Sequence, residues 1–275
     1  MYVDYGADTH VGMVREKNED SLLMWVEEGL FLVADGMGGH GNGEIASQEC
    51  VEAIQEYYTR PQTSHPAPLD EETVLALRAD KLTRAVRHAN DRILGLVERR
   101  PSLVGMGTTV VAAHVGGSKT LVAHAGDSRC YLLRGGDLFM LTDDHSLVNE
   151  VEGMGKLTTE MAMKLEDYQH VLVNAIGVHP SDKCRVDVTS LQPEIGDRLL
   201  LCSDGLTNEV GDQEIRDLLD GELRSRDLSS QLVARANAEG GRDNVTVLVL
   251  TWLAEKPEDT ADDFGDTEDF MPTLD

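Results

Sequence analysis

The chain has 275 residues, enough for one large domain, and 41% of them are hydrophobic, enough for a sizeable core. Aromatic residues make up only 4%, so aliphatic side chains must fill that core. The formal net charge is −26. This charge argues against nucleic acids and anionic membrane surfaces as partners, because both attract basic surfaces.

The cysteine pattern and the polarity of the chain indicate a cellular compartment. None of the four cysteines (Cys50, Cys130, Cys184 and Cys202) belongs to a CxxC pair, which is typical of reduced, buried thiols and not of a disulfide framework or a zinc site. The N-terminus lacks a basic region followed by an apolar core, and no apolar run approaches the roughly 20 residues of a membrane span. We therefore expect a soluble, cytoplasmic protein.

In chain order, most apolar runs are short, rich in Val and Leu, and bounded by Gly, Asp or Ser, as strands are. The predicted strands are Ser21–Val26, Leu30–Ala34, Thr108–Val115, Thr120–Ala125, Arg129–Arg134, Arg198–Ser203 and Val245–Leu253. Apolar residues at helical spacing predict helices over Gly43–Tyr58, Glu71–Glu98, Asp212–Leu219 and Asp227–Ala238. Asp127-Ser128 and Gly135-Gly136-Asp137 are predicted hairpin turns. This order of elements predicts a layered α+β domain.

Three segments depart from this pattern. Pro61–Pro68 is a predicted loop between the first two helices. Residues 144–173 are predicted to form one or two short helices, either as a mobile flap or as an ordinary insertion packed on the core. We place the domain at residues 1–254 and an acidic tail at 255–275, which should be disordered. The tail is either a solvated segment or an acidic-hydrophobic peptide that docks on a partner or on a basic patch.

Three aspartates follow or precede apolar runs in glycine-rich turns. Asp35-Gly36 follows Leu30–Ala34, Asp204-Gly205 follows Leu199–Ser203, and Asp243 stands just before the run that starts at Val245. Strands that deliver carboxylates into glycine-lined turns are suited to hard cations, because Mg²⁺ and Mn²⁺ prefer oxygen ligands. An acidic protein that handles phosphate also needs such cations. The sequence therefore predicts a shared metal centre.

The order of the motifs and the residues within them resemble those of a known protein family. In sequence they are Val11–Asp20, Val33–His40, Gly105–Thr109, Ala123–Arg129, Thr142–Ser146, Ser203-Asp204-Gly205 and Gly241–Thr246. Together they resemble the metal-dependent serine/threonine protein phosphatases (the PPM family, type 2C) in their bacterial form, from about Asp8 to Leu250. The resemblance implies a sandwich of two antiparallel β-sheets flanked by helix pairs, with a helical flap insertion.

The resemblance also implies a role for individual residues of the metal centre. Asp35 resembles the carboxylate that bridges two metal ions, and the carbonyl of Gly36 resembles a ligand of one of them. Asp204 and Asp243 resemble the remaining carboxylates at the other ion. Glu19 and Asp20 resemble acids that hold one ion or its waters.

Three further residues complete the implied site. Arg15 resembles the residue that grips the substrate phosphate with its planar donor fork. Asp127 resembles a ligand of a third, weaker ion, with Asp204 shared. Asn244 is expected to orient the loop of Asp243. The ions are expected to be Mn²⁺ or Mg²⁺, which lower the pKa of a water held between them, and no covalent phosphoenzyme is needed.

The chain departs from the family pattern at two places. Met37 stands where eukaryotic members carry a histidine that can act as general acid, so the leaving group must be protonated by a metal-bound water or another group. His40 and His145 are candidates by sequence proximity only, and a structural role is favoured for both. Val173–Gly177 replaces the Thr-Arg-Ala-Leu-Gly segment that is usual in bacterial members. The second departure puts substrate recognition in doubt but leaves the metal chemistry intact.

Several functions remain open at this point. The first is a phosphatase that acts on phosphoserine and phosphothreonine in proteins and opposes a bacterial kinase. The second is a catalytically silent member that serves as a scaffold, although such members usually lose a metal carboxylate and Asp35, Asp204 and Asp243 are all present. The third is a relative with one dedicated phosphoprotein substrate. A metallonuclease is disfavoured by the charge, and a monomer is expected.

Overall fold

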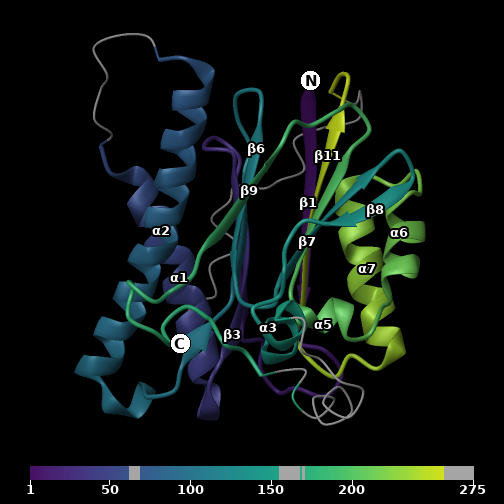
Figure 1. Cartoon of the computed structure of the whole chain (residues 1–275). Helices are drawn as coiled ribbons and strands as arrows, with labels where there is room; N and C mark the ends of the chain where they lie inside the picture. Colours follow the sequence, from purple (N-terminus) through teal and green to yellow (C-terminus); the bar gives the residue numbers. More distant parts are fainter. Residues whose placement is uncertain (62–68, 155–167, 169–170, 257–275) are drawn as a thin grey trace.

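The computed structural model describes residues 1–61, 69–154, 168 and 171–256. Within this part of the chain, two antiparallel sheets pack face to face, and each is covered on its outer face by helices (Figure 1). This is the α+β sandwich that the resemblance implied. The layers run helix pair, sheet, sheet, helix pair, and both pairs of helices are visible at the sides of the molecule in Figure 1.

The strand order in the first sheet is β1-β11-β10-β7-β8, and in the second it is β2-β3-β5-β6-β9, with β4 paired to β3. The first sheet comprises β1 (Tyr2–His10), β7 (Arg129–Arg134), β8 (Asp137–Met140), β10 (Arg198–Cys202) and β11 (Val245–Leu253). The second sheet comprises β2 (Asp20–Trp25), β3 (Leu30–Met37), β4 (Gly107–Thr108), β5 (Val110–His114), β6 (Thr120–Ala125) and β9 (Asp187–Leu191).

The long helices α1 (Asn42–Thr59) and α2 (Glu71–Arg99) cover the second sheet, while α6 (Asp212–Leu219) and α7 (Ser225–Glu239) cover the first. The side chain of Asp70 caps α2 by accepting from the Thr73 N–H at 2.8 Å. Shorter helical elements are η1 (Gly39–Gly41), η2 (Pro101–Leu103), α3 (Leu147–Gly153) and α5 (Asp204–Thr207).

The central strands are apolar on both faces because each face has a core of its own. On β3, Leu30 and Leu32 pack against α1 and α2, whereas Phe31 and Val33 point between the sheets. Strands β10 and β11 alternate in the same way, towards α6 and α7 or towards the other sheet. This arrangement explains why the sequence shows continuous apolar runs and not the alternation of a sheet with one wet face.

Most predicted elements are confirmed, and four have the predicted bounds: β6, β7, β11 and α6. The edge strands β1 and β9 were missed, because acids, glycine and polar residues interrupt their apolar pattern. The turn Gly135-Gly136 does join the β7–β8 hairpin, with both glycines at positive φ.

The predicted hairpin at Asp127-Ser128 is wrong. Strand β6 before it belongs to the second sheet, and β7 after it belongs to the first, so these residues carry the chain across the sandwich. The pattern of a polar pair between two apolar runs cannot distinguish a turn within one sheet from a crossing between two. The crossing brings Asp127 to the edge where both sheets end.

Parts of the three unusual segments lie outside the described residues. Of the predicted loop Pro61–Pro68, only Pro61 is described, and of the predicted flap, residues 155–167 and 169–170 are not. The described start of the flap forms α3, with the Ser146 hydroxyl capping it through the Asn149 N–H. The tail from residue 257 onward also lies outside the description. Among the described helices, none is long and apolar enough to cross a membrane.

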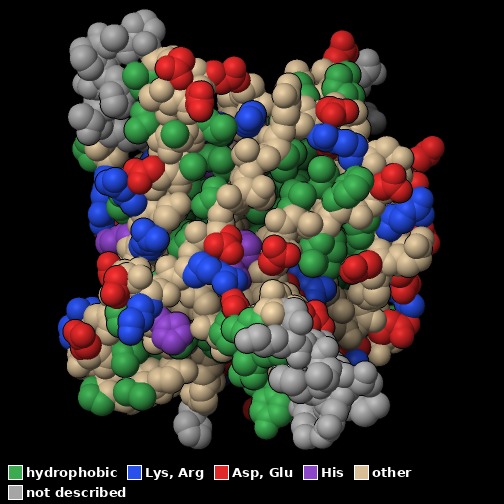
Figure 2. Space-filling view, viewed as in Figure 1, with side chains coloured by type: hydrophobic (Ala, Val, Ile, Leu, Met, Phe, Trp, Pro, Cys, Tyr) green, Lys and Arg blue, Asp and Glu red, His purple; other side chains and the backbone are tan. Residues whose placement is uncertain are grey.

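Figure 2 shows one face of the molecule, on which basic and acidic side chains are interspersed over the helical layers.

The apolar core beneath α2 leads to a prediction about stability. Leu82 and Leu77 both lie on α2, but Leu82 is fully buried and Leu77 is 40% exposed. We expect Leu82→Ala to lower the free energy of unfolding by about 2–5 kcal/mol, because it leaves a cavity under the helix.

The matched variant Leu77→Ala should change the same free energy by less than about 1 kcal/mol. Urea unfolding followed by circular dichroism measures both values. Equal losses in the two variants would contradict the assignment of the buried face of α2.

Candidate metal centre

Five aspartates converge at one edge of the sandwich, the lower edge in Figure 1, where β3 ends and α5 begins. Asp35 lies near the end of β3, and Asp20 is its register partner on β2. Asp127 follows β6, Asp204 follows β10, and Asp243 stands two residues before β11. In an antiparallel sheet, one strand ends at the edge where its neighbour begins. Strand ends and strand starts of both sheets therefore bring these side chains to the same edge of the sandwich.

The carboxylates influence one another's ionisation. Burial raises the pKa of Asp35 well above its usual value, and the charges of Asp20, Asp204, Asp127 and Asp243 raise it further. Burial likewise raises the pKa of Asp20 to about 7, and the charges of Asp204 and Asp243 add to the rise. The hydrogen bonds that Asp20 accepts lower its pKa in part. For Asp127, burial and the charge of Asp204 raise the pKa to about 7. Such a cluster is stabilised when a cation compensates the repulsion.

The surroundings of Asp20 indicate where such a cation belongs. Its Oδ2 accepts hydrogen bonds from the Ser203 and Thr246 hydroxyls at 2.8 and 2.6 Å, so residues of the first sheet hold an acid of the second. Its Oδ1 is buried and has no hydrogen-bond partner among the described residues. A buried carboxylate oxygen without a donor is costly unless a metal ion satisfies it.

The backbone of Asp35 is fixed by two threonines that the sequence analysis did not single out. Its carbonyl accepts from the Thr109 N–H at 2.8 Å and from the Thr108 hydroxyl at 2.8 Å. Its N–H donates to Thr109 Oγ1 at 3.1 Å, and that hydroxyl also contacts Ser128 Oγ at 2.6 Å. Ser128, directly after Asp127, was the local signal, because short hydroxyl side chains can fix a neighbouring backbone. The two threonines gave no such signal for Asp35, because they lie 73 and 74 positions away in the sequence.

Glu19 and Gly36 meet the start of α1. The Glu19 carbonyl accepts from the Gly36 N–H at 3.1 Å. A Cβ added at Gly36 would lie 2.2 Å from the Gly43 carbonyl oxygen, so only glycine fits between the strand and the helix. Burial raises the pKa of the Glu19 carboxyl, while Arg15 and a hydrogen bond from the Gly43 backbone lower it. The structure therefore places this carboxylate at the positive end of α1.

Asn244 connects the Asp243 turn to the segment that carries Arg15. Its Nδ2 donates to the carbonyls of Val11 and Lys17 at 2.9 and 2.8 Å, and its Oδ1 accepts from the Glu19 N–H at 2.8 Å. Its backbone N–H donates to Asp243 Oδ1 at 2.8 Å. That Asn244 orients the Asp243 loop stays a prediction, and the structure adds its contacts with the Arg15 segment.

The turn of Asp243 is held from the other side. Glu209 accepts from the Arg242 N–H at 3.0 Å and from its guanidinium at 2.8 and 3.0 Å. Arg15 Nη2 lies 2.7 Å from Asp243 Oδ2, with 52% of the Arg15 side chain exposed. The structure thus joins the phosphate-binding candidate to a metal-ligand candidate, and leaves the rest of the guanidinium facing solvent.

The two histidines considered as general acids are His145, which is buried, and His40, whose side chain is not described. The His145 side chain is fully buried and lies against Gly126, Asn174 and Asp187. Burial lowers its pKa to about 4, and the neighbouring His124 and Arg185 contribute to that fall. A buried imidazole that is neutral near pH 7 cannot easily deliver a proton to a leaving group. The side chain of His40 lies outside the described residues.

Comparison with known proteins identifies the family of the chain. The family model for protein phosphatase 2C matches residues 13–253. The chain belongs to the protein phosphatase 2C family. It is 35% identical to the serine/threonine phosphatase Stp of Listeria welshimeri over 257 residues, which covers 91% of this chain and 95% of that relative.

Solved structures of the family resemble this chain as well. The PstP/Ppp phosphatase of Mycobacterium tuberculosis has a TM-score of 0.77 and 35% identity, covering 91% of this chain and 99% of that one. The catalytic domain of PstP in complex with two manganese ions has a TM-score of 0.75 and 34% identity, covering 91% of this chain and 98% of that one. Protein phosphatase 2C enzymes are metal-dependent phosphoprotein hydrolases, and this chain is such an enzyme.

The residues at this edge fit the metal ions of the protein phosphatase 2C family. The available donors are carboxylate and carbonyl oxygens, which suit Mn²⁺ and Mg²⁺. The unpartnered Oδ1 of Asp20 and the mutual repulsion of the acids both call for positive charge. The five aspartates thus supply the oxygen ligands that these ions prefer.

The raised pKa values predict how pH affects the metal-free protein. Folding raises the pKa of Asp20 and Asp127 from 3.8 to about 7, so between these values the folded chain binds more protons than the unfolded chain. Their contribution to stability is fully present below about pH 4 and is lost as the pH rises through about 7. We expect Mn²⁺ to stabilise the protein more at pH 8 than at pH 6.5.

The measurement is the difference in melting temperature between samples in Mn²⁺ and in EDTA at each pH. This difference removes the effect of groups remote from the site, such as buried histidines, which titrate in both samples. A difference that is the same at both pH values would contradict the assignment of these aspartates to the metal centre.

Proposed function

We propose that this chain hydrolyses phosphoserine and phosphothreonine in proteins with two Mn²⁺ or Mg²⁺ ions, and that it opposes a bacterial serine/threonine kinase. The observation that carries the proposal is the gathering of five aspartates from both sheets at one edge, with a buried oxygen of Asp20 left without a donor. The position of Arg15 beside this edge supports a phosphate ester as substrate.

Each residue at the edge has a proposed part in holding the ions. Asp35 is proposed to lie between the two ions, and the carbonyl of Gly36 to bind one of them. Asp204 and Asp243 are proposed to bind the other, and Asp127 to share a third with Asp204. When bound, the ions would supply positive charge for the phosphate oxygens and lower the pKa of the attacking water.

The protein residues around the ions position the reactants. Glu19 and Asp20 are proposed to hold one ion or its waters. Arg15 offers a planar fork of donors to non-bridging phosphate oxygens, and its exposure allows a bulky phosphoprotein to reach it. Asn244 fixes the backbone on both sides of Arg15, which reduces the entropy that the loop loses when phosphate binds.

Three further features of the protein are proposed. The catalytic domain spans residues 1–254, with a flap at about 144–173 and a tail at 255–275, and the family match that ends at residue 253 supports the boundary. A cytoplasmic location is supported by four cysteines that are all free and buried. The active form is proposed to be a monomer, because the five aspartates come from a single chain.

Hydrolysis of a phosphothreonine peptide and of a small aryl phosphate tests the function. We expect turnover of both in Mn²⁺ or Mg²⁺ and none in EDTA. Asp204→Ala should abolish turnover while leaving the circular dichroism spectrum unchanged, because it removes a proposed ligand at the edge of the fold. The matched control is Asp217→Ala, an acid that is 58% exposed on α6 and should leave turnover unchanged.

Retention of near wild-type activity by Asp204→Ala would show that the metal centre is wrongly assigned. A folded wild-type protein without turnover in either metal would instead favour a scaffold role.

Deletion of residues 255–275 tests the proposed domain boundary. Because β11 ends at Leu253, we expect the shortened chain to fold and to hydrolyse the small aryl phosphate at the wild-type rate. Steady-state kinetics of both forms in Mn²⁺ provide the comparison. A large loss of kcat would mean that the tail takes part in the site.

A further inference from the structure

The segment that follows β8 runs beside the crossing that carries Asp127. Leu141 donates its N–H to the Cys130 carbonyl at 2.8 Å, and Thr142 Oγ1 accepts from the Cys130 N–H at 3.1 Å. Further along, the Arg129 guanidinium binds both carboxylate oxygens of Asp144, with the shortest contact at 2.7 Å. The start of β7, directly after the crossing, is therefore held by residues that lead into the proposed flap.

His145 binds both backbone groups of Gly126, the residue before Asp127. Its N–H donates to the Gly126 carbonyl at 2.9 Å, and its Nδ1 accepts from the Gly126 N–H at 3.2 Å. The imidazole thus takes the place that a backbone carbonyl has in a β-ladder. Gly126 has a φ of +112°, and an added Cβ would lie 2.6 Å from Thr109 Cβ, so its backbone has no alternative packing.

The hydrogen bonds around His145 determine its tautomer. Asn174 Oδ1 accepts from the Arg185 N–H at 3.0 Å, and its Nδ2 donates to the Arg185 carbonyl at 2.9 Å, so the orientation of this amide is fixed. The same Nδ2 lies 2.7 Å from His145 Nδ1. Two donors thus face Nδ1, whereas Nε2 faces one donor, Arg185 Nε–H at 3.1 Å, and one acceptor, Asp187 Oδ2 at 3.2 Å. A proton on Nδ1 would leave the Gly126 N–H and Asn174 Nδ2 without their acceptor, while Arg185 Nε also reaches Asp187 Oδ2 at 3.3 Å, so the neutral ring carries its proton on Nε2.

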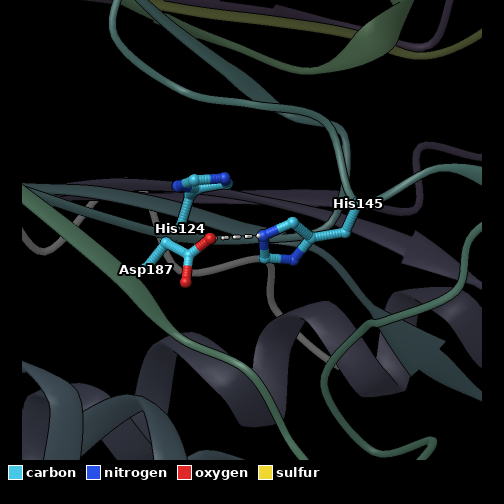
Figure 3. A group of neighbouring side chains, drawn as sticks. All are labelled: His124, His145 and Asp187. Atoms are coloured by element: carbon cyan, nitrogen blue, oxygen red, sulfur yellow. Dashed lines mark hydrogen bonds and ion pairs between the residues drawn. The ribbon is translucent and has the colours of Figure 1, made fainter. Parts of the chain in front are cut away.

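Figure 3 shows His124, His145 and Asp187, whose possible ligand atoms lie within 4.8 Å of one another. The hydrogen bonds disfavour a metal ion in this group, because a metal on His145 Nε2 would require the ring proton to move to Nδ1, which faces two donors. Arg185 Nε also lies 3.1 Å from that nitrogen and 3.3 Å from Asp187 Oδ2, where a metal ion would have to compete with its charge. The group acts as a structural anchor.

We propose that His145, held in its Nε2–H tautomer by Asp187, is a positioning residue that aligns Asp127 for the weaker metal ion that Asp127 shares with Asp204. The proposal rests on the proposed function for the role of Asp127 as a ligand. It extends that function by making the base of the flap, from Asn174 to Asp187, a determinant of how tightly this ion is held. Partners of a ligand commonly set metal affinity in this way.

Binding of Mn²⁺ to the full chain, measured by isothermal titration calorimetry, tests the proposal without reference to turnover. In His145→Leu the Gly126 N–H loses its acceptor, and we expect the weakest class of Mn²⁺ sites to lose roughly tenfold or more in affinity, while the tighter class is unchanged. His145→Asn keeps an acceptor near the Nδ1 position and should restore most of the affinity. His88→Leu is the matched control, because His88 contacts Arg60 in the helical layer and should leave both classes unchanged.

Two variants of Asp187 separate the tautomer from the packing of the ring. Asp187→Asn keeps an acceptor for Nε2–H and should bind Mn²⁺ like the wild type. Asp187→Ala removes the acceptor and leaves the Arg185 Nε–H, 3.1 Å away, as the donor that faces Nε2, which favours a proton on Nδ1, facing the Gly126 N–H. We expect this variant to show both the weakened Mn²⁺ class and, in ¹H–¹⁵N correlation spectra of the imidazole, a shift of the His145 proton from Nε2 to Nδ1.

Unchanged binding in both His145→Leu and Asp187→Ala would overturn the proposal, as would a wild-type protein with no weaker class of Mn²⁺ sites. If His145→Leu does not fold, His145→Asn and Asp187→Ala still decide the question. Failure of the proposed function is recognised separately, because it would abolish turnover of the wild type and leave these binding curves in place.

Discussion

The site depends on one constraint, which is that mutually repelling carboxylates are held together at the edge of a sandwich where they are partly removed from water. Burial and mutual charge raise the pKa values of Asp20, Asp35 and Asp127 together. Burying these carboxylates close together destabilises the folded chain when no cation is bound. A cation that compensates their charges explains why they lie together.

The carboxylates stay in place because neutral donors from distant segments hold them or their backbones. Ser203 and Thr246 grip Asp20 from the opposite sheet, and Thr109 binds the backbone of Asp35 while touching Ser128 beside Asp127. Hydroxyl groups are suited to this task because they donate or accept without adding charge to an already charged site. The two sheets are thereby joined at the metal edge by hydrogen bonds as well as by the apolar core between them.

The same design extends outward to the proposed flap. His145 connects Gly126 to Asn174 and Asp187, so the part of the chain that departs from the family pattern at Val173–Gly177 is bonded to the crossing that carries Asp127. The proposed roles of the flap and of Asp127 would link substrate recognition and metal affinity through a short chain of contacts. The link is local and geometric, and it requires no large movement of either sheet.

The sequence by itself determined the family and the sandwich, because apolar runs, glycine turns and motif order are local properties. It predicted the acids of the proposed metal centre. It also predicted most strands to within a residue or two at each end. Only the tertiary structure decided that Asp127-Ser128 crosses between sheets, that Asn244 holds the Arg15 loop, and that His145 is an anchor and not an acid. Each of these depends on hydrogen bonds between residues far apart in the chain, and no local pattern records which distant backbone group a polar side chain will meet.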